Sequence, residues 1–271
     1  MEPRNRRSFL KDLGLGTTAF SIAGEQEKSM PGRPTVGGEE TAISSTLMTI
    51  AAHPGDAFFA MGAPVANQIH HGGHGVFVSL SLGEKGSATI PPGEYGALQR
   101  EATVRAAQML GAQAEFLAYP DGQIPINDEA SLAVCDMIRE YQPAIVVTHW
   151  RGSWHKDHRA CYEIVDRAIF YASLPAFTRK QPAHRVKKLF FAENWEDAED
   201  FRPDTYLDIS AVFERWTEAC AVFPMWRGEN GFRYDDYYRS LARANGCIGN
   251  FEYAAALMSP AEQLMRRVPS L

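Results

Sequence analysis

Residues 46–59, TLMTIAAHPGDAFF, decide the fold of this chain. A short apolar segment ends abruptly at the sequence HPGD (53–56), which is typical of a buried strand that stops at a tight turn. The following residues, AFFAMGAPVANQIHH, have the spacing of a helix, and we expect Asp56 at or near its N-cap. In open α/β sheets, sites form beyond the carboxyl ends of the strands. His53 and Asp56 are therefore well placed for chemistry.

Short apolar segments alternate with helical segments along the following 150 residues. Strands are predicted within 75–87, 114–122, 144–150 and 187–195, and helices at 94–111, 127–141 and 157–173. This alternation favours an α/β fold with a Rossmann-like, mostly parallel sheet flanked by helices. Beyond residue 205 the chain is predicted to be mostly helical (208–222, 231–245 and 259–267). We therefore expect a single domain over residues 46–271 with a helical C-terminal segment.

The N-terminal residues have the features of an export signal. Arg6 and Arg7 precede Phe-Leu-Lys and a weakly apolar stretch, which predicts a twin-arginine signal over residues 1–24. The alternative is a basic N-terminus in which two arginines are adjacent by chance. Residues 25–45 are rich in Gly, Pro, Glu and Ser and are interpreted as a linker. The signal predicts export to the periplasm or another extracytoplasmic compartment.

The overall composition excludes several classes of partner. The chain has 271 residues and a net charge of −6, which argues against binding to nucleic acid or to an anionic membrane surface. No apolar run is long enough to span a membrane. Cys135, Cys161, Cys220 and Cys247 are widely spaced and are interpreted as core thiols. No GxGxxG follows the first strand, so the sheet is not expected to bind a dinucleotide. The sequence makes no prediction of oligomeric state.

A second cluster of polar residues follows the strand at 144–150. The sequence RGSWHKDHRA (151–160) brings His155, Asp157 and His158 to the end of that strand. His53, Asp56 and His158 together would offer two imidazoles and one carboxylate to a single ion and leave positions open for water and substrate. This donor set suits zinc, but also iron or cobalt. In isolation, His53 would be interpreted as a structural strand end.

The two motifs together resemble the LmbE-like (PIG-L) family of metal-dependent de-N-acetylases. HPGD after the first strand and HKDH after the fourth match the family's usual HPDD and HPDH motifs. A Gly-Glu loop (83–84), an Arg-Glu pair (100–101) and a Pro-Asp-Gly turn (120–122) occur in the family's order. The resemblance covers roughly residues 46 to 210.

The resemblance implies specific roles for individual residues. It assigns His53, Asp56 and His158 as ligands of Zn²⁺, with Fe²⁺ as an alternative. His155 would steady the oxyanion or protonate the leaving amine, and Asp157 would hydrogen-bond its imidazole. Arg100 would contact the substrate, which is a small molecule or glycoconjugate such as an N-acetylated amino sugar.

Two departures from the family pattern concern catalysis and substrate. The family's general base, the first Asp of HPDD, is replaced by Gly55, and Asp157 or Glu84 are the candidates to take its place. The segment ERWTEACAVFPMW contains Trp216, Phe223 and Trp226 and predicts an apolar substrate mouth.

Other functions and other residue roles stay open. Gly55 motivates the alternative of a catalytically impaired metal protein that binds a glycoconjugate, and a further alternative is an ester hydrolase. His149 is expected either to line the cleft or to be buried and hydrogen-bonded, and Asp121 is interpreted as a turn former. His70, His71 and His74 are interpreted as solvent-facing residues at a helix end. The aromatic residues of a second group are interpreted as helix packing: Trp226, Tyr234, Tyr237 and Tyr238.

Overall fold

The strands assemble into one seven-stranded sheet in the order β3-β2-β1-β4-β5-β7-β6. The computed structural model describes residues 45–197 and 199–264, so the predicted export signal and nearly all of the predicted linker lie outside the described residues. The strands, in sheet order, are β3 (Gln113–Tyr119), β2 (His74–Ser81), β1 (Thr46–Ala51), β4 (Ile145–Thr148), β5 (Lys188–Ala192), β7 (Ala254–Met258) and β6 (Thr205–Asp208). The first five in this order are parallel, whereas β7 pairs antiparallel with both β5 and β6. The predicted Rossmann-like, mostly parallel sheet is confirmed.

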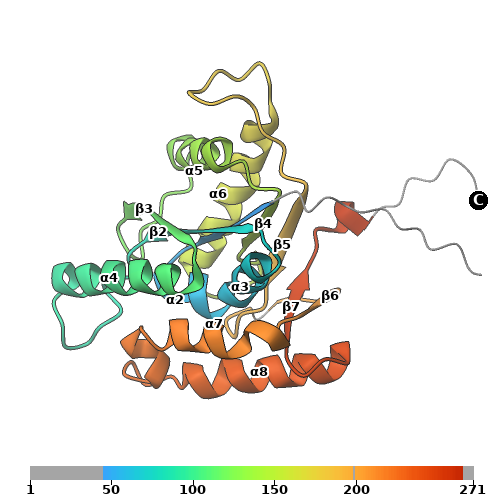
Figure 1. The fold of residues 1–271 in the computed structure, drawn as a ribbon. Coiled ribbons are helices and arrows are strands. Elements are labelled where there is room, and N and C mark those ends of the chain that lie inside the picture. The colour runs from blue at the N-terminus through green and yellow to red at the C-terminus, as the bar shows by residue number, and fades with distance from the viewer. Residues whose placement is uncertain (1–44, 198, 265–271) are drawn as a thin grey trace, which may run out of the picture. The chain divides into compact units, whose positions relative to one another are not determined.

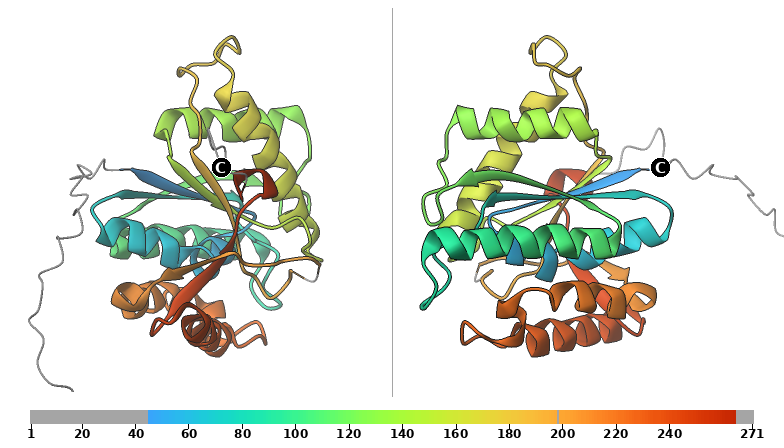
Figure 2. Two further views of the ribbon diagram at one scale, coloured as in Figure 1. Left: turned by 90° about the vertical axis from the view of Figure 1, so that its right-hand side faces the viewer. Right: turned by 60° about the vertical axis from the view of Figure 1, so that its left-hand side comes forward.

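Helices cover both faces of the sheet (Figure 1). One face packs on α5 (Asp128–Tyr141) and α6 (Lys156–Ser173). The other face packs on α2 (Pro54–Phe59), α3 (Gly62–His70) and α4 (Pro92–Leu110), with α7 (Phe213–Cys220) and α8 (Tyr234–Gly249) beyond them, as Figure 2 shows from two further sides. Three 3-10 helices complete the secondary structure of the described residues: η1 (Ser210–Val212), η2 (Pro224–Arg227) and η3 (Ala261–Leu264).

Strand β1 supplies side chains to both hydrophobic cores. Successive side chains of a strand point to opposite faces, so Leu47 and Ala51 enter the core beneath α2, α3 and α4, while Met48 and Ile50 enter the core beneath α5 and α6. All four side chains are buried. An apolar run buried on both faces is what a central parallel strand requires.

The helix after β1 begins earlier than predicted and is interrupted. Its N-cap is His53, with extended backbone, and Asp56 lies in the first turn of α2. Pro54 at the first helical position explains the early start, because its fixed φ suits that position and its missing N–H leaves no orphan donor. Ala60 and Met61 separate α2 from α3. The helices predicted at 94–111 and 127–141 are confirmed as α4 and α5, with Gly111 as the left-handed C-cap of α4 and Asn127 as the N-cap of α5.

The C-terminal segment contains helices α7 and α8, as predicted, but differs from the prediction in three respects. The segment beyond residue 205 contains two strands, β6 and β7, in addition to its helices, and of the predicted helix at 259–267 the described part holds only the four-residue η3. Trp216, Phe223 and Trp226 are at most 3% exposed and belong to the core, so they do not form the predicted apolar mouth.

Three cysteines are buried as predicted, but Cys247 is exposed. Among the helices of the described residues, none combines the length and apolar character needed to cross a bilayer.

Candidate metal centre and its pocket

The parallel strands end at one edge of the sheet, and the loops at this edge carry the site. β1 leads into His53 and helix α2, and β4 leads into the loop that ends at the N-cap of α6, His155. β1 and β4 are neighbours in the sheet, and the strand order reverses between them. This is the position at which open α/β sheets form a crevice.

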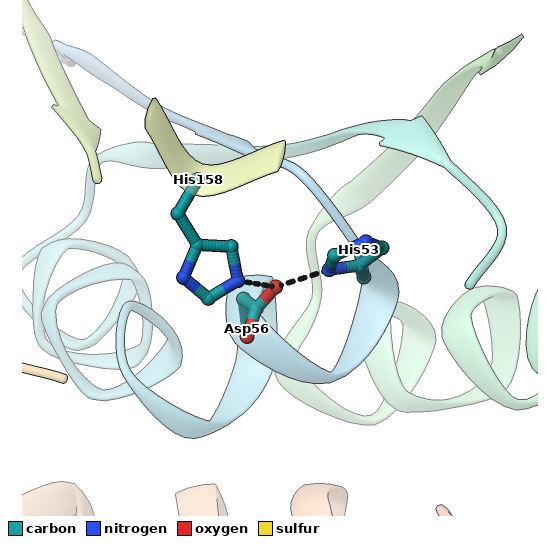
Figure 3. A group of neighbouring side chains, drawn as sticks. All are labelled: His53, Asp56 and His158. Atoms are coloured by element: carbon teal, nitrogen blue, oxygen red, sulfur yellow. Dashed lines mark hydrogen bonds and ion pairs between the residues drawn. The ribbon is translucent and has the colours of Figure 1, made fainter. Parts of the chain in front are cut away.

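Three donor atoms from the two loops converge on one point. The Oδ2 atom of Asp56 lies 2.9 Å from Nδ1 of His53 and 3.0 Å from Nε2 of His158. Figure 3 shows both imidazoles directed at the same carboxylate oxygen. The structure thus brings together the three residues that the sequence predicts as metal ligands.

Carboxylates lie behind both histidines. Nε2 of His53 is 3.2 Å from Oδ1 of Asp121 and 3.5 Å from Oδ2 of Asp157, and Nδ1 of His158 is 3.0 Å from Oε2 of Glu196. A carboxylate on the far nitrogen fixes the orientation of a ligating imidazole and makes it a better donor. Asp121 therefore does more than form the predicted turn.

Charge pairing dominates the ionisation of the three donors. Burial alone would raise the pKa of Asp56, but the adjacent His158 and hydrogen bonds from both imidazoles hold it well below its usual range. Burial would lower the pKa of His158, yet Asp56 and Glu196 raise it to about 9. Hydrogen bonds to Asp121, Asp157 and Asp56 likewise outweigh burial and raise the pKa of His53. Without a metal, the site favours a carboxylate held between protonated imidazoles.

His155 has the opposite electrostatic environment. Burial, together with the neighbouring His158 and His53, lowers its pKa, so this imidazole is neutral near pH 7. Its Nδ1 accepts a hydrogen bond from the backbone N–H of Asp157 at 3.2 Å. The neutral ring therefore carries its proton on Nε2. The resemblance implied that the carboxylate of Asp157 would bond this imidazole, but the backbone N–H makes the contact instead.

Two predicted catalytic acids support the Pro-Asp-Gly turn. Oε1 of Glu84 accepts the backbone N–H of Asp121 at 2.8 Å, and Oδ2 of Asp157 accepts that of Gly122 at 2.6 Å. Neither Glu84 nor Asp157 lines the pocket described below. Both contacts hold Asp121 against His53.

The predicted substrate contact Arg100 lies away from the donors. Its side chain is exposed, and its guanidinium lies 4.1 Å from the ring centroid of Phe116. The preceding residue, Gln99, is buried and lines the pocket instead.

A pocket of about 150 Å³ opens over the donor atoms. Since one water molecule needs only about 10–15 Å³ of such space, the pocket fits a small molecule or one end of a larger one. Its lining residues come from the segments that follow the five parallel strands and from α4, η2 and α8: His53, Gly55, Asp56, Phe59, Gly83, Gly86, Tyr95, Gln99, Asp121, His155, His158, Trp195, Glu196, Met225 and Tyr234.

The remaining histidines are structural. His149 is buried, its Nε2 accepts the backbone N–H of Ala52 at 3.1 Å, and its ring stacks on His158. His70, His71 and His74 are exposed at the end of α3 and the start of β2, as predicted. Of the predicted aromatic packing cluster, Trp226 and Tyr238 are buried, whereas Tyr234 reaches the pocket.

Glu196 and Gln99 line the pocket but belong to none of the sequence motifs. Glu196 follows β5 and is 8% exposed, so an acid just beyond a fifth parallel strand was the available signal. Gln99 lies within a helix and carries no motif. Its position in the pocket depends on how α4 packs.

The donor set suits a divalent metal. Two imidazole nitrogens and one carboxylate oxygen are the ligands that zinc and similar ions take in catalytic sites, and the carboxylates behind the imidazoles complete the pattern. His53, Asp56 and His158 would hold the ion.

Comparison with known proteins gives consistent results. Residues 48–169 match the profile of the family PIG-L, described as GlcNAc-PI de-N-acetylase. The 4-oxalmesaconate hydratase of Pseudomonas putida is 23% identical over 210 residues, which cover 74% of this chain and 80% of that protein. The 1D-myo-inositol 2-acetamido-2-deoxy-alpha-D-glucopyranoside deacetylase of Streptomyces griseus is 28% identical over 176 residues, or 54% of each chain. The chain thus matches about half the length of this deacetylase.

A solved structure supports the fold. The crystal structure of GalB, the 4-carboxy-2-hydroxymuconate hydratase from Pseudomonas putida, superposes with a TM-score of 0.74 at 22% identity. The match covers 84% of this chain and 99% of that one. At this level of identity, the likeness establishes a shared fold.

Proposed function

We propose that the protein is a metal-dependent hydrolase, because residues 48–169 match the profile of the PIG-L family. Its substrate is an N-acylated, uncharged small molecule or glycoconjugate such as an N-acetylated amino sugar. The observation that carries the proposal is the convergence of His53, Asp56 and His158 beneath a pocket that His155 also lines.

The metal-holding residues supply the electrophilic side of the reaction. Zn²⁺, or a similar ion such as Fe²⁺, held by His53, Asp56 and His158 would lower the pKa of water and polarise the amide carbonyl. Asp121 and Glu196 keep the two imidazoles turned toward Asp56. Asp157 and Glu84 act indirectly, since they hold the turn that carries Asp121.

His155 serves the developing oxyanion and the leaving amine. With Nδ1 accepting the backbone N–H of Asp157, its Nε2–H is free to donate into the pocket. A preorganised donor of this kind favours the tetrahedral transition state over the planar amide. The same proton can pass to the departing nitrogen.

Glu196 takes the part of the base that Gly55 cannot supply. Both oxygens of Asp121 are engaged, one near His53 and the other by the backbone N–H of Lys85. Glu196 holds His158 through Oε2, so that Oε1 is left to accept a proton from the attacking water. This assignment differs from Asp157 and Glu84, because neither of those acids lines the pocket.

The test measures metal content and amine release on the same full-length, zinc-loaded protein. We expect about one metal per chain and release of glucosamine from N-acetylglucosamine. Glu196→Gln should lower kcat by about 10² or more, the lower range of a lost general base, with metal content retained. His158→Ala should lose the metal, whereas the exposed His74→Ala should not. A fully loaded protein that releases no amine from N-acetylated sugars would contradict the proposal.

A hydratase is the second candidate. The relatives named as hydratases favour it, and Gly55 removes the usual hydrolytic base. Their substrate names denote carboxylates, whereas none of the described residues that line this pocket is Lys or Arg. The pocket charge therefore favours an uncharged substrate. Loss of the ultraviolet absorbance of an unsaturated dicarboxylate, without amine release from acetamides, would establish the hydratase instead.

We also propose that the chain is exported by the twin-arginine route, on the sequence of residues 1–24. Changing Arg6 and Arg7 to Lys in the full chain should abolish export. Export that persists would contradict this assignment.

A further inference from the structure

The wall of the pocket beside Gly55 is built differently from the metal side. A Cβ atom placed on Gly55 would lie 3.2 Å from Sδ of Met225 and 3.2 Å from Cε2 of Phe59. Both distances are shorter than ordinary van der Waals contact, so these two side chains occupy the space next to residue 55. The thioether of Met225, on η2, thus closes the pocket where an acidic side chain at position 55 would project.

Gln99 faces the same part of the pocket from helix α4. It is 2% exposed, and its Nε2 has a single weak contact at 3.8 Å with Sδ of Met225. Its Oε1 is buried and has no hydrogen-bond partner among the described residues. A buried amide oxygen without a partner destabilises the fold, so such groups in native proteins are normally satisfied by a ligand or by water.

The surroundings of Gln99 determine what kind of group fits beside it. The nearby lining residues Phe59, Tyr95, Met225 and Tyr234 are uncharged. The carboxylates and histidines of the pocket belong to the loops at the metal side. With Nε2 of Gln99 directed at Sδ of Met225, its Oε1 is the atom left to accept a hydrogen bond from an N–H or O–H, and an acceptor oxygen does not bind a carboxylate.

We propose that Gln99 and Met225 form a specificity subsite that receives an uncharged, hydrogen-bond-donating part of the substrate. This inference rests on the proposed function, since it concerns the same pocket. Oε1 of Gln99 accepts the substrate's N–H or O–H, while Met225 and Phe59 pack against the adjoining carbon atoms. The subsite takes the space that a side chain at position 55 would need, which links the Gly55 substitution to substrate recognition.

The test replaces Gln99 with Met, which has the same length and lacks the acceptor. The full-length, zinc-loaded protein is assayed with N-acetylglucosamine for kcat/KM and, by calorimetry, for Kd. We expect Gln99→Met to lower kcat/KM and weaken Kd by about 10-fold, the effect of one lost neutral hydrogen bond. Its Tm should not fall, because an unpaired buried polar group has been removed. Gln99→Leu is measured alongside as a second variant, and Gln108→Met, an exposed position on the same helix, should match the wild type.

Each outcome separates this inference from the proposed function. A wild type that hydrolyses N-acetylglucosamine, with the Gln99 variants equally active and tight-binding, overturns the subsite alone. A wild type that binds the sugar without hydrolysing it contradicts the proposed function, and the ratio of Kd values then decides the subsite. A lower Tm with unchanged Kd assigns Gln99 a structural role and overturns the subsite. A wild type that neither binds nor hydrolyses the sugar contradicts both.

Discussion

At the scale of single residues, Gly55 stands where the HPDD motif of the family that this chain resembles has an Asp. The side chains of Met225 and Phe59 occupy the space beside it. An Asp introduced at position 55 must therefore displace these side chains before it can act as a base.

We predict that Gly55→Asp alone destabilises the protein by about 1–3 kcal/mol, because Met225 and Phe59 must move. Gly55→Asp combined with Met225→Ala should recover much of this loss and give a higher kcat than Met225→Ala alone. Thermal unfolding and amine release are the measurements. Gly93→Asp is the control, since a Cβ there meets nothing within 4 Å. Equal Tm values for Gly55→Asp and the wild type would contradict the packing argument.

The sequence predicted the donors but not the residues around them. His53, Asp56 and His158 follow the ends of two strands that the apolar pattern predicts. Because parallel strands end at the same edge of a sheet, this prediction is enough to bring the three residues together. Gln99 enters the pocket through the packing of α4, which no local pattern encodes, whereas Glu196 lies just beyond β5, at a strand end that carries no His-Pro motif. Arg100 illustrates the limit, because one residue along a helix turns a side chain by about 100° and here replaces Arg with Gln in the pocket.

At the scale of elements, the five parallel strands were predictable and the two antiparallel ones were not. β1 to β5 have apolar runs flanked by turn residues. β7 has the sequence AAALM, whose residues favour helices, and it becomes a strand because β5 and β6 pair with it on both sides. β6, with the sequence TYLD, is as short as β4 but lacks the apolar run of IVVT, so no pattern marks it as a strand.

Helix α5 allows a test of how its ends stabilise the fold. The side chain of Asn127 accepts the backbone N–H of Ala130 at 2.8 Å, so Asn127→Ala should lower the free energy of unfolding by about 1 kcal/mol. At the other end, Gln142 has a φ of 46°, a left-handed conformation in which glycine is unstrained. Gln142→Gly should therefore raise the free energy of unfolding by about 0.5–1 kcal/mol. Chemical denaturation measures the free energy of unfolding of both variants. The prediction requires that it falls in Asn127→Ala and rises in Gln142→Gly.

At the scale of the whole molecule, the candidate metal centre joins the two halves of the sheet. Asp56 follows β1 and His158 follows β4, so the contacts between them cross the crevice at which the strand order reverses. Protons and a metal compete for these atoms, since a ligating imidazole must be neutral. The stability of the entire fold should therefore depend on both pH and metal.

The direction of this pH dependence follows from the pKa of His158, which is raised from 6.5 to about 9 in the metal-free protein. A raised folded-state pKa gives stability that is fully present below pH 6.5 and is lost as the pH rises through 9. The free energy of unfolding of the chelated protein should thus fall by roughly 2 kcal/mol between pH 6.5 and 9, while that of the zinc-loaded protein should not. Denaturation at pH 6, 7.5 and 9, with and without chelator, measures the difference. His158→Gln, which keeps a hydrogen bond to Asp56 but does not titrate, should remove most of the fall. A chelated wild type whose stability is flat over this range would show that His158 is not held against Asp56 as a protonated imidazole.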